Sequence, residues 1–553
     1  MTTRLRIAAV CALSCLMFVG AGAPDRPETP AARDVEIGEQ LITPAKLKLH
    51  LNFIASDELE GRATPSRGLD LAARYIASHL EYYGYQPAGD DGTYFQKIAM
   101  SRRKPSRQSR LHVEGRGGAA DFLLGIDFLG SPGNAKGKLV FAGYGLSSKE
   151  ADYDDYAGLD VKGKLAVVFD GLPPGLDPKL FKVPAMFNPV TRRPEPSKFS
   201  IAAQHGAIGV VTLKAPEYTA AAPDGKPSPF QQSLGALDRE TTVFDFRDSP
   251  VPAPMIDLTP DAAKRLEQAL GVDFAAARNK IAETKKPHPV NIDGSFESEF
   301  KHDVVEKLAT QNVVGFLEGS DPKLKDEIVA FSAHYDHLGS RQVSADGRAA
   351  AVPGAAPNAA ASTDGIYNGA DDDGSGTVGI LNLAEAFAGV ARTRRSLLFI
   401  WHAGEERGLI GSEYFVRSPV KPLDKFAALF NIDMIGRNFE DKEANADHVY
   451  LVGAAKTSRE FNEIIHRIAG DRMRLDETDA RNYFRRSDHF HYARNRIPVV
   501  FFCTGEHKDY HQPSDEVRSI RFDKMKQILD IVFECGLDVA NRDTRPAFTG
   551  EGL

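Results

Sequence analysis

Five short segments in the second half of the chain carry clusters of histidine, aspartate or glutamate. In chain order they are 333–337 (AHYDH), 369–376 (GADDDGSG), 404–406 (GEE), 431–434 (NIDM) and 510–513 (YHQP). Imidazole and carboxylate donors without thiolate suit zinc or a related metal in a catalytic site that keeps open positions. The residue types therefore indicate a metal-dependent catalytic site, and no CxxC or cysteine-rich zinc pattern competes with them.

The number of carboxylates in these segments favours more than one metal ion. Three carboxylates in one crevice repel each other at low dielectric, and burial without a counter-charge raises their pKa values. Two divalent cations remove that cost, and a bridging carboxylate gives the two-metal clamp of aminopeptidases and phosphatases.

Each cluster taken alone also has an ordinary structural explanation. A single histidine is more often structural than a ligand, and the aspartates at 371–373 would be a solvated turn or a helix N-cap. The glutamate pair at 405–406 would be an exposed charged pair. The ordered occurrence of all the clusters is what favours the metal site.

Four of the clusters follow short, continuous apolar runs. These runs occupy 327–332, 396–401, 427–432 and 497–502, and helical patterns lie between them at 378–389 and 458–468. Such runs are typical of strands that are buried on both faces. Because the carboxyl ends of the strands form the ligand crevice of an open α/β sheet, residues distant in sequence should meet at one edge.

Length and composition describe an ordinary globular protein. The chain has 553 residues, 42% of them hydrophobic and 26% charged, with a net charge of −8. This length exceeds what one core supports, which predicts two domains or one domain with a large insertion. The mild acidic charge predicts no nucleic-acid partner and gives no reason for binding at a membrane surface.

The N-terminal segment has the pattern of a secretory signal peptide at 1–23. Arg4 and Arg6 precede an apolar run at 7–19, which small residues follow at 20–23. The run is too short to anchor the chain stably in a bilayer, so we expect a periplasmic or extracellular protein. Residues 24–42 are rich in proline, alanine and charge, and are predicted to form a flexible leader. Cys503 and Cys535 remain after cleavage, either as a disulfide or as two buried free thiols.

The middle of the chain differs from its flanks in the pattern of its apolar runs and turns. Short β-rich runs, for example 138–142 and 208–213, are separated by glycine, proline and aspartate turns, and no metal-ligand cluster appears there. This segment is predicted to be a separate module without chemistry of its own. The alanine-, glycine- and proline-rich segment 340–367 is interpreted either as a lid over the pocket or as a floppy insertion.

In their order, the motifs resemble those of the M28 family of zinc peptidases. The resemblance covers about 43–125 and 300–540 and includes EERGLIGS at 405–412, SDH at 487–489 and YHQPSD at 510–515. It implies a three-layer, mixed-sheet α/β catalytic domain at 43–125 and 298–541. GLDVKGKL at 158–165 and HGAIGV at 205–210 resemble a protease-associated (PA) domain, predicted as an insertion at 126–297. A flexible tail is expected at 542–553.

The resemblance also implies a role for particular residues. Two zinc ions per chain would bind to five ligands, with one carboxylate bridging the ions. The bridging residue is Asp372, one ion is completed by His334 and Asp433, and the other by Glu406 and His511. A further three residues act around these ligands: Glu405 as general base, Asp336 as the carboxylate that orients a histidine ligand, and Tyr510 as a hydrogen-bond donor to the oxyanion.

The function that this resemblance implies is removal of N-terminal residues from peptides by metal-activated water. A carboxypeptidase or dipeptidase of the same fold is the first alternative. It requires a cationic pocket for the substrate carboxylate, for which the candidates are Arg437, Arg481, Arg485 and Arg486. A receptor-like binding protein is disfavoured because all ligands and Glu405 are present, and a glutaminyl cyclase would be expected to bind one zinc ion.

Overall fold

The chain forms two compact units in a computed structural model. The structure describes residues 30–188, 193–221, 225–247, 251–288, 290, 292–341, 365–478 and 481–550. Unit 1 comprises Met1–Gln96 and Asn312–Leu553, and unit 2 comprises Lys97–Gln311. The predicted signal peptide at 1–23 and most of the 340–367 segment lie outside the described residues.

Unit 1 is built on a mixed β-sheet. Its strands are, in spatial order, β16 (His302–Leu317, in its last part), β20 (Ser396–His402), β17 (Ile328–His334), β21 (Phe426–Ile432), β24 (Val499–Cys503), β22 (His448–Val452) and β23 (Arg474–Asp476), with β1 (Gln86–Pro87) paired to β16. Strands β20, β17, β21 and β24 are mutually parallel, whereas β16 runs antiparallel to β20 and β22 runs antiparallel to β24. Strand β23 is parallel to β22. The four parallel strands are the four apolar runs of the sequence, so the predicted α/β mixed sheet is confirmed.

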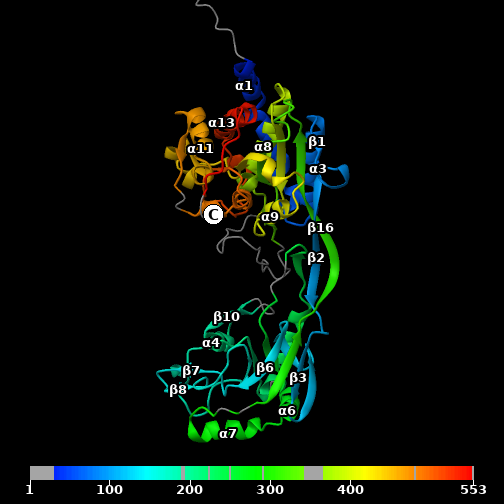
Figure 1. Cartoon of the computed structure of the whole chain (residues 1–553), viewed down its shortest axis with the longest axis vertical. Coiled ribbons are helices and arrows are strands. Elements are labelled where there is room, and N and C mark those ends of the chain that lie inside the picture. Colours follow the sequence, from blue (N-terminus) through cyan, green and yellow to red (C-terminus); the bar gives the residue numbers. More distant parts are fainter. Residues whose placement is uncertain are drawn as a thin grey trace, which may run out of the picture. The chain divides into compact units, whose positions relative to one another are not determined.

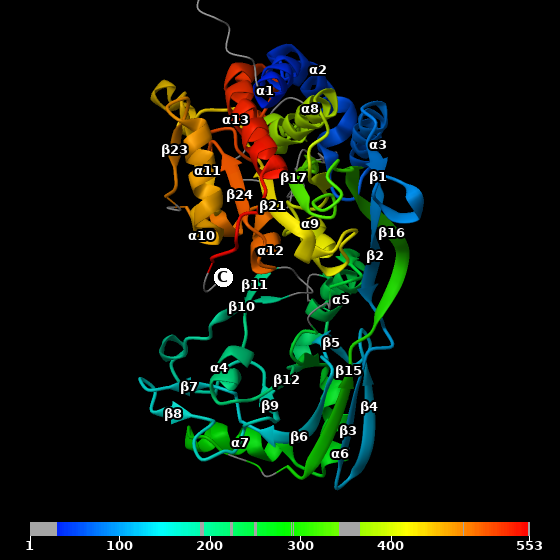
Figure 2. The ribbon, with the colours of Figure 1, turned by 45° about the horizontal axis from the view of Figure 1, so that its top comes forward.

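Helices cover both faces of this sheet (Figures 1 and 2). The helices of the first face are α1 (Pro30–Leu41), α2 (Pro44–Ile54), α3 (Arg67–Tyr82), α8 (Gly376–Gly389), α10 (Ala454–Thr457), α11 (Arg459–Ala469) and α13 (Phe522–Asn541). Helices α9 (Ile410–Arg417) and α12 (His489–Arg494) pack on the second face. The three-layer arrangement is therefore as predicted.

The apolar runs of the sequence are continuous because each central strand packs against helices on both sides. In β17 every residue is buried: Phe331 belongs to the first core and Ala330 to the second. The ring of Phe331 stacks on the rings of Phe399 and Phe430 in the adjacent strands, with centroids 4.8 and 5.1 Å apart. This row of rings joins the three strands that carry most of the candidate ligands.

Part of the predicted flexible leader at 24–42 is instead helical. Residues Pro30–Leu41 form α1, which packs against α8 and α13. Gly38 is buried against the ring of Phe533, where a Cβ atom would come within 2.0 Å of that ring. The small residue allows α1 to approach α13 closely, and this tertiary contact is not visible in the composition of the segment.

Unit 2 is a β-rich fold with its own core. Its main sheet has the order β4 (Gly118–Leu123), β3 (Arg110–Gly115), β15 (Gly294–Glu299), β6 (Ala135–Phe141), β9 (Leu165–Phe169), β12 (Gly209–Leu213), β14 (Met255–Leu258) and β5 (Phe128–Ser131). The remaining elements are β2 (Phe95–Pro105), which pairs with β13 (Thr241–Phe244), the hairpins β7–β8 (Ser147–Ser148, Tyr153–Asp154) and β10–β11 (Ala185–Asn188, Arg193–Pro196), and helices α4 (Phe199–Gln204), α5 (Pro229–Leu234), α6 (Pro260–Leu270) and α7 (Phe274–Thr284).

The limits of unit 2 are wider than those of the insertion expected at 126–297. Strands β3 and β4 precede residue 126 but pair with β15, and therefore belong to the core of unit 2. The identity of this unit as a PA-like domain remains a prediction.

The ends of the chain and its cysteines add two observations. Residues 542–550 have no regular secondary structure, although the amide of Thr549 donates to the carbonyl of Thr457. Cys503 and Cys535 are buried free thiols. None of the helices in the described part of the chain has both the length and the apolar character needed to cross a membrane.

Truncation of Phe331 to alanine should lower the free energy of unfolding of unit 1 by about 3–5 kcal/mol, because a fully buried aromatic side chain is lost. The chain has one tryptophan, Trp401, which is buried in unit 1, so its fluorescence during urea unfolding reports on this unit. Tyr82→Ala is the control, since Tyr82 is 85% exposed. Equal shifts of the urea midpoint in the two variants would contradict the proposed importance of the ring stack.

Candidate metal centre

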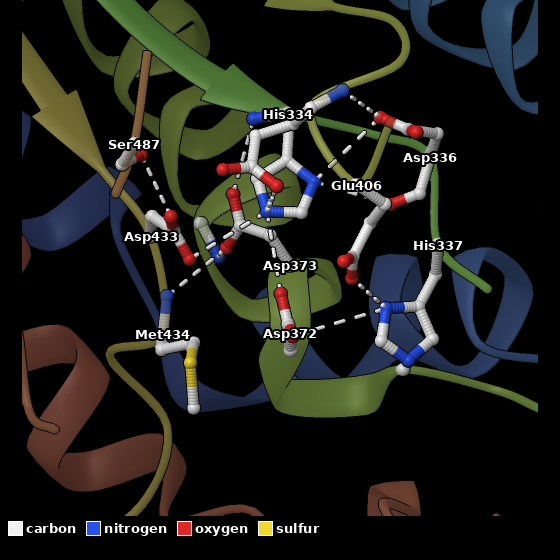
Figure 3. A network of polar contacts seen from close by, with 12 residues as sticks. His334, Asp336, His337, Asp372, Asp373, Glu406, Asp433, Met434 and Ser487 are labelled. Carbon is white, nitrogen blue, oxygen red and sulfur yellow. Dashed lines mark hydrogen bonds and ion pairs between the residues drawn. The ribbon is translucent and has the colours of Figure 1, made fainter. Parts of the chain in front are cut away.

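The candidate ligands lie at the carboxyl ends of the parallel strands. His334 is the last residue of β17, and Asp433 directly follows β21. Glu405 and Glu406 follow β20 after a turn at Gly404, which has φ +74° and therefore favours glycine. The convergence expected from the sequence is thus observed for these strands (Figure 3).

Asp372 lies between the histidines predicted for the two metal ions. It belongs to the irregular turn Ala370–Ser375 that precedes α8. Its Oδ1 is 3.2 Å from Nε2 of His334, and its Oδ2 is 3.0 Å from Nε2 of His511. Each carboxylate oxygen therefore faces a different histidine, as a bridging ligand requires.

Two groups of ligand atoms share this carboxylate. One contains His334, Asp372 and Asp433, and the other contains His337, Asp372 and Glu406. In each group one ligand atom per residue lies within 4.8 Å of the others. Ligand atoms about 2.1 Å from a tetrahedral zinc ion are about 3.4 Å apart. Nε2 of His334 lies 3.2 Å from Asp372 and 3.6 Å from Oδ1 of Asp433, so the first group fits zinc.

Two histidines compete for the second group. Nε2 of His511 is 3.0 Å from Oδ2 of Asp372 and 3.2 Å from Oε2 of Glu406. Nδ1 of His337 is 2.8 Å from Oε1 of Glu406 but 3.9 Å from Oδ2 of Asp372. The distances of His511 are closer to those of a tetrahedral set. The sequence motifs do not mark His337 as a ligand, because its proximity to Glu406 depends on the path of the chain after β17.

Several buried polar atoms of the site lack hydrogen bonds within the described residues. They include Nε2 of His337, together with Nδ1 of His337 and Oε1 of Glu406, which lie 2.8 Å apart but are not aligned for a hydrogen bond. Buried polar groups of this kind are normally satisfied, and a cation bound among them would supply the missing partner. Together with the imidazole and carboxylate donors, these atoms fit a pair of zinc ions.

The charges of the site are strongly coupled. Burial alone would lower the pKa of His334, but the carboxylates of Asp433 and Glu405 raise it well above its ordinary value. Burial would raise the pKa of Asp372, yet contacts with His334 and His511 hold it well below the ordinary value. The ligand carboxylates thus depend on nearby positive charge to stay ionised.

Glu405 is fixed beside the ligands by Asp336. The backbone amide of Glu405 donates to Oδ1 of Asp336 at 3.1 Å, and the hydroxyl of Thr64 donates to Oδ2 at 3.0 Å. Nδ1 of His334 is closer to the carbonyl oxygen of Asp336, at 3.1 Å, than to its carboxylate, at 3.7 Å. Asp336 therefore contacts both the predicted base and the predicted ligand.

Tyr510 lies beside the ligand that follows it. Its ring stacks on that of His511 with centroids 3.9 Å apart, and Nη2 of Arg486 donates to its hydroxyl at 3.3 Å. Burial raises the pKa of Tyr510, so its hydroxyl keeps its proton at neutral pH. A cavity of about 30 Å³ is lined by this tyrosine, Arg486, Glu405 and the candidate ligands His334, Asp372 and Asp433.

Asp373 joins three elements of the site, a role that no motif in the sequence indicates. Its Oδ2 accepts from the amide of His334 at 3.2 Å. Its Oδ1 accepts from the amides of Gly376 and Met434, at 2.8 and 3.1 Å. One carboxylate therefore ties the ends of β17 and β21 to the start of α8.

The carboxylates of Asp371 and Asp515 support the turn that presents Asp372. The amides of Asp371 and Asp372 donate to Asp515, and the amide of Gly436 donates to Oδ1 of Asp371 at 2.6 Å. Burial raises the pKa of Asp515 to about 6. These contacts hold the turn against the segment that follows Asp433.

Arg62 supplies a buried positive charge behind the ligands, and no spacing in the sequence marks it. Its guanidinium donates to the carbonyls of four residues: Ile54, Tyr335, Asn368 and Gly369. Burial lowers its pKa to about 10, while neighbouring aspartates, Asp336 and Asp373 foremost, oppose that shift. Arg62 therefore remains a cation at neutral pH and offsets part of the carboxylate charge.

Comparison with known proteins agrees with this geometry. Residues 312–535 match the family model described as Peptidase family M28. This segment is therefore similar to that family. It contains every residue to which the sequence analysis assigned a catalytic or metal-binding role, and it lies within unit 1.

Several relatives of this chain are named as aminopeptidases. A probable leucine aminopeptidase of Trichophyton verrucosum is 30% identical over 30% of this chain and 45% of its own length. Aminopeptidase YwaD of Bacillus subtilis is 25% identical over 43% of this chain and 46% of its own. The chain thus spans about half the length of the curated relatives it matches. A solved aminopeptidase from Aneurinibacillus sp. strain AM-1 superposes with a TM-score of 0.44 at 18% identity, over 94% of this chain and 98% of its own.

Zinc-equilibrated wild-type protein should retain two zinc ions per chain after dialysis, measured by inductively coupled plasma mass spectrometry. His511→Ala should retain about one, because it removes a ligand of the second group only. His491→Ala, a histidine on α12 outside both groups, is the matched control and should retain two. Retention of two ions by His511→Ala and of one by His337→Ala would transfer the ligand role to His337.

Proposed function

We propose that the chain is an exported aminopeptidase that uses two zinc ions to remove N-terminal residues from peptides. The observation that carries the proposal is the shared carboxylate of Asp372, whose two oxygens face two ligand sets, with Glu405 beside them. The similarity to M28 peptidases and to aminopeptidases supports the reaction class. Export rests on the signal-peptide pattern at 1–23.

His334, Asp372 and Asp433 would hold one ion, and Asp372, Glu406 and His511 the other. When bound, two zinc ions supply Lewis acidity and a source of nucleophilic water at neutral pH. The chain's own contribution is to fix the ligand atoms before binding: Ser487 donates to Oδ2 of Asp433 at 2.7 Å.

Glu405 is suited to the movement of protons. Burial above all raises its pKa well above the ordinary value, and Glu406 and Asp433 act in the same direction. A carboxylate with a raised pKa takes a proton from the attacking water more readily and can return it to the leaving amine. Its backbone contact with Asp336 keeps the side chain over the ligands.

Tyr510 is placed to stabilise the oxyanion that forms at the peptide carbonyl. Its hydroxyl is protonated at neutral pH, and stacking on His511 fixes the ring. The hydrogen bond from Arg486 adds positive charge next to this hydroxyl. A donor held in this way costs no reorganisation when charge develops on the substrate.

The charges around the pocket favour a substrate amine over a substrate carboxylate. Arg481 and Arg486 each donate to Glu506 at 2.7 Å, and Arg437 pairs with Asp441 and Asp509. Three of the four arginines considered for a carboxylate clamp are therefore paired with acidic groups. Among the described residues, Glu405 and Asp433 line the cavity without an arginine partner of this kind, and such carboxylates attract an ammonium group.

Unit 2 is proposed to control access or substrate choice instead of chemistry. Both ligand groups found among the described residues belong to unit 1. Unit 2 has its own hydrophobic core, which allows it to act as a separate module.

Glu405→Gln should keep both zinc ions and lower kcat by about 10²–10⁴-fold, because it removes the base without removing a ligand. Stopped or steady-state assays with an aminoacyl p-nitroanilide, combined with metal analysis of the same sample, measure both effects. Glu413→Gln on α9 is the matched control and should leave kcat unchanged. A Glu405→Gln enzyme with wild-type kcat would remove Glu405 from the mechanism.

Acetylation of the substrate's N-terminus should lower kcat/KM by at least about 100-fold, because it removes the ammonium charge that the carboxylates attract. Amidation of the C-terminus should change kcat/KM little. A matched set of tripeptides, assayed with and without a chelator, separates the two effects. Tolerance of acetylation with loss on amidation would support the carboxypeptidase alternative and direct attention to Arg485.

A further inference from the structure

A second cavity in unit 1, of about 570 Å³, lies at the first turns of α2 and α13. Its lining includes Pro44 and Lys48 of α2 and Phe522 to Lys524 of α13, but no residue of the two metal-ligand groups. Its volume is within the range of small-molecule binding sites, about 300–1,000 Å³. The cavity is therefore separate from the metal centre and large enough for a ligand.

The positive end of α13 is open toward this cavity. Its N-cap, Arg521, makes no side-chain hydrogen bond to the first turn. In contrast, the N-cap of α2 is occupied, because Thr43 accepts from the amide of Lys46. The first N–H groups of an uncapped helix and the helix dipole together favour an anion. A helix terminus alone does not define a site, so the side chains around it are decisive.

Asn438 provides an independent sign of a missing ligand. It lines the cavity and is 1% exposed. Its Oδ1 accepts from Nζ of Lys524 at 3.2 Å, whereas its Nδ2 has no hydrogen-bond partner among the described residues. Because an ammonium group only donates, the amide oxygen must face Lys524, and the amide nitrogen is the end left to bind something else. That nitrogen can only donate, so its partner must be an acceptor.

The charges of the lining agree with an anionic acceptor. Lys48, Arg521 and Lys524 contribute three cations, of which Arg521 is also paired with Glu443 outside the lining, and Asp523 is the one acidic residue of the lining. Lys524 is 5% exposed, and its ammonium group donates hydrogen bonds to Oδ1 of Asn438 and to the carbonyl of Asn445. Burial lowers its pKa to about 8, so a bound anion would stabilise its charged form.

We propose that this cavity binds a phosphate group, either as the free ion or as part of a small phosphorylated molecule. A phosphate has several acceptor oxygens, which match the amide of Asn438, the ammonium of Lys524 and the first turn of α13. Lys48 and Arg521 lie exposed at the cavity and add attraction from its rim. The proposal is independent of the peptidase reaction.

Isothermal titration calorimetry of inorganic phosphate into the zinc-loaded full chain tests the site. The double variant Lys48→Gln/Arg521→Gln changes two exposed side chains and should therefore fold normally. It should weaken phosphate binding by about tenfold or more, since two charge-assisted contacts are lost. The control Lys442→Gln/Lys526→Gln removes two cations that do not line the cavity and should leave the Kd unchanged.

A parallel titration with glycerol 3-phosphate distinguishes the two sources of the phosphate group. Tighter binding of the ester supports a phosphorylated molecule, and tighter binding of the inorganic ion supports free phosphate. Asn438→Leu should also weaken binding in either case, because it removes the donor without adding charge. Absence of phosphate binding to the wild type, or the same Kd in the wild type and the Lys48→Gln/Arg521→Gln variant, would overturn the proposal.

Discussion

The repulsion between buried carboxylates is the constraint around which unit 1 is organised. Asp336, Asp371, Asp372, Asp373 and Asp515 are all buried, and Glu405, Glu406 and Asp433 lie beside them. Such groups cannot all be ionised in a low-dielectric interior without positive charge or hydrogen-bond donors close by. Two bound cations would neutralise the ligand carboxylates. The remaining aspartates are stabilised in other ways, and these determine much of the local architecture.

Backbone amides and one arginine stabilise the carboxylates that face away from the ligand groups. Asp373 and Asp515 accept hydrogen bonds from chain amides at the strand ends and at the turn before α8. Arg62 adds a fixed positive charge and at the same time satisfies carbonyls from three distant segments. Its many donors bind several backbone groups at once, which a lysine could not do with the same planar geometry. The same contacts thus hold the backbone in place and balance the buried charges.

Sequence reasoning succeeded where local pattern determines position. The continuous apolar runs predicted the four parallel strands, and the residues that follow them were predicted to meet at one edge, as His334 and Asp433 do. It failed where contacts between residues distant in sequence determine the position of a side chain or helix. Arg62 contacts carbonyls up to about 300 positions away, so no spacing identifies it. The proximity of His337 to Glu406 depends on the path of the chain after β17, and the helix at α1 depends on its packing on α13.

The contacts of Asp373 also bear on the entropy of metal binding. Three chain amides, from His334, Gly376 and Met434, converge on this carboxylate through hydrogen bonds made entirely by the polypeptide. The backbone that carries the candidate ligands is therefore ordered by contacts within the chain, in contrast to zinc fingers, in which the metal itself drives folding. The chain therefore loses little conformational entropy when an ion binds. Because this entropy cost offsets little of the free energy of coordination, the ion binds more tightly. A rigid ligand frame of this kind also selects among divalent ions by size and geometry, because it cannot relax to suit each one.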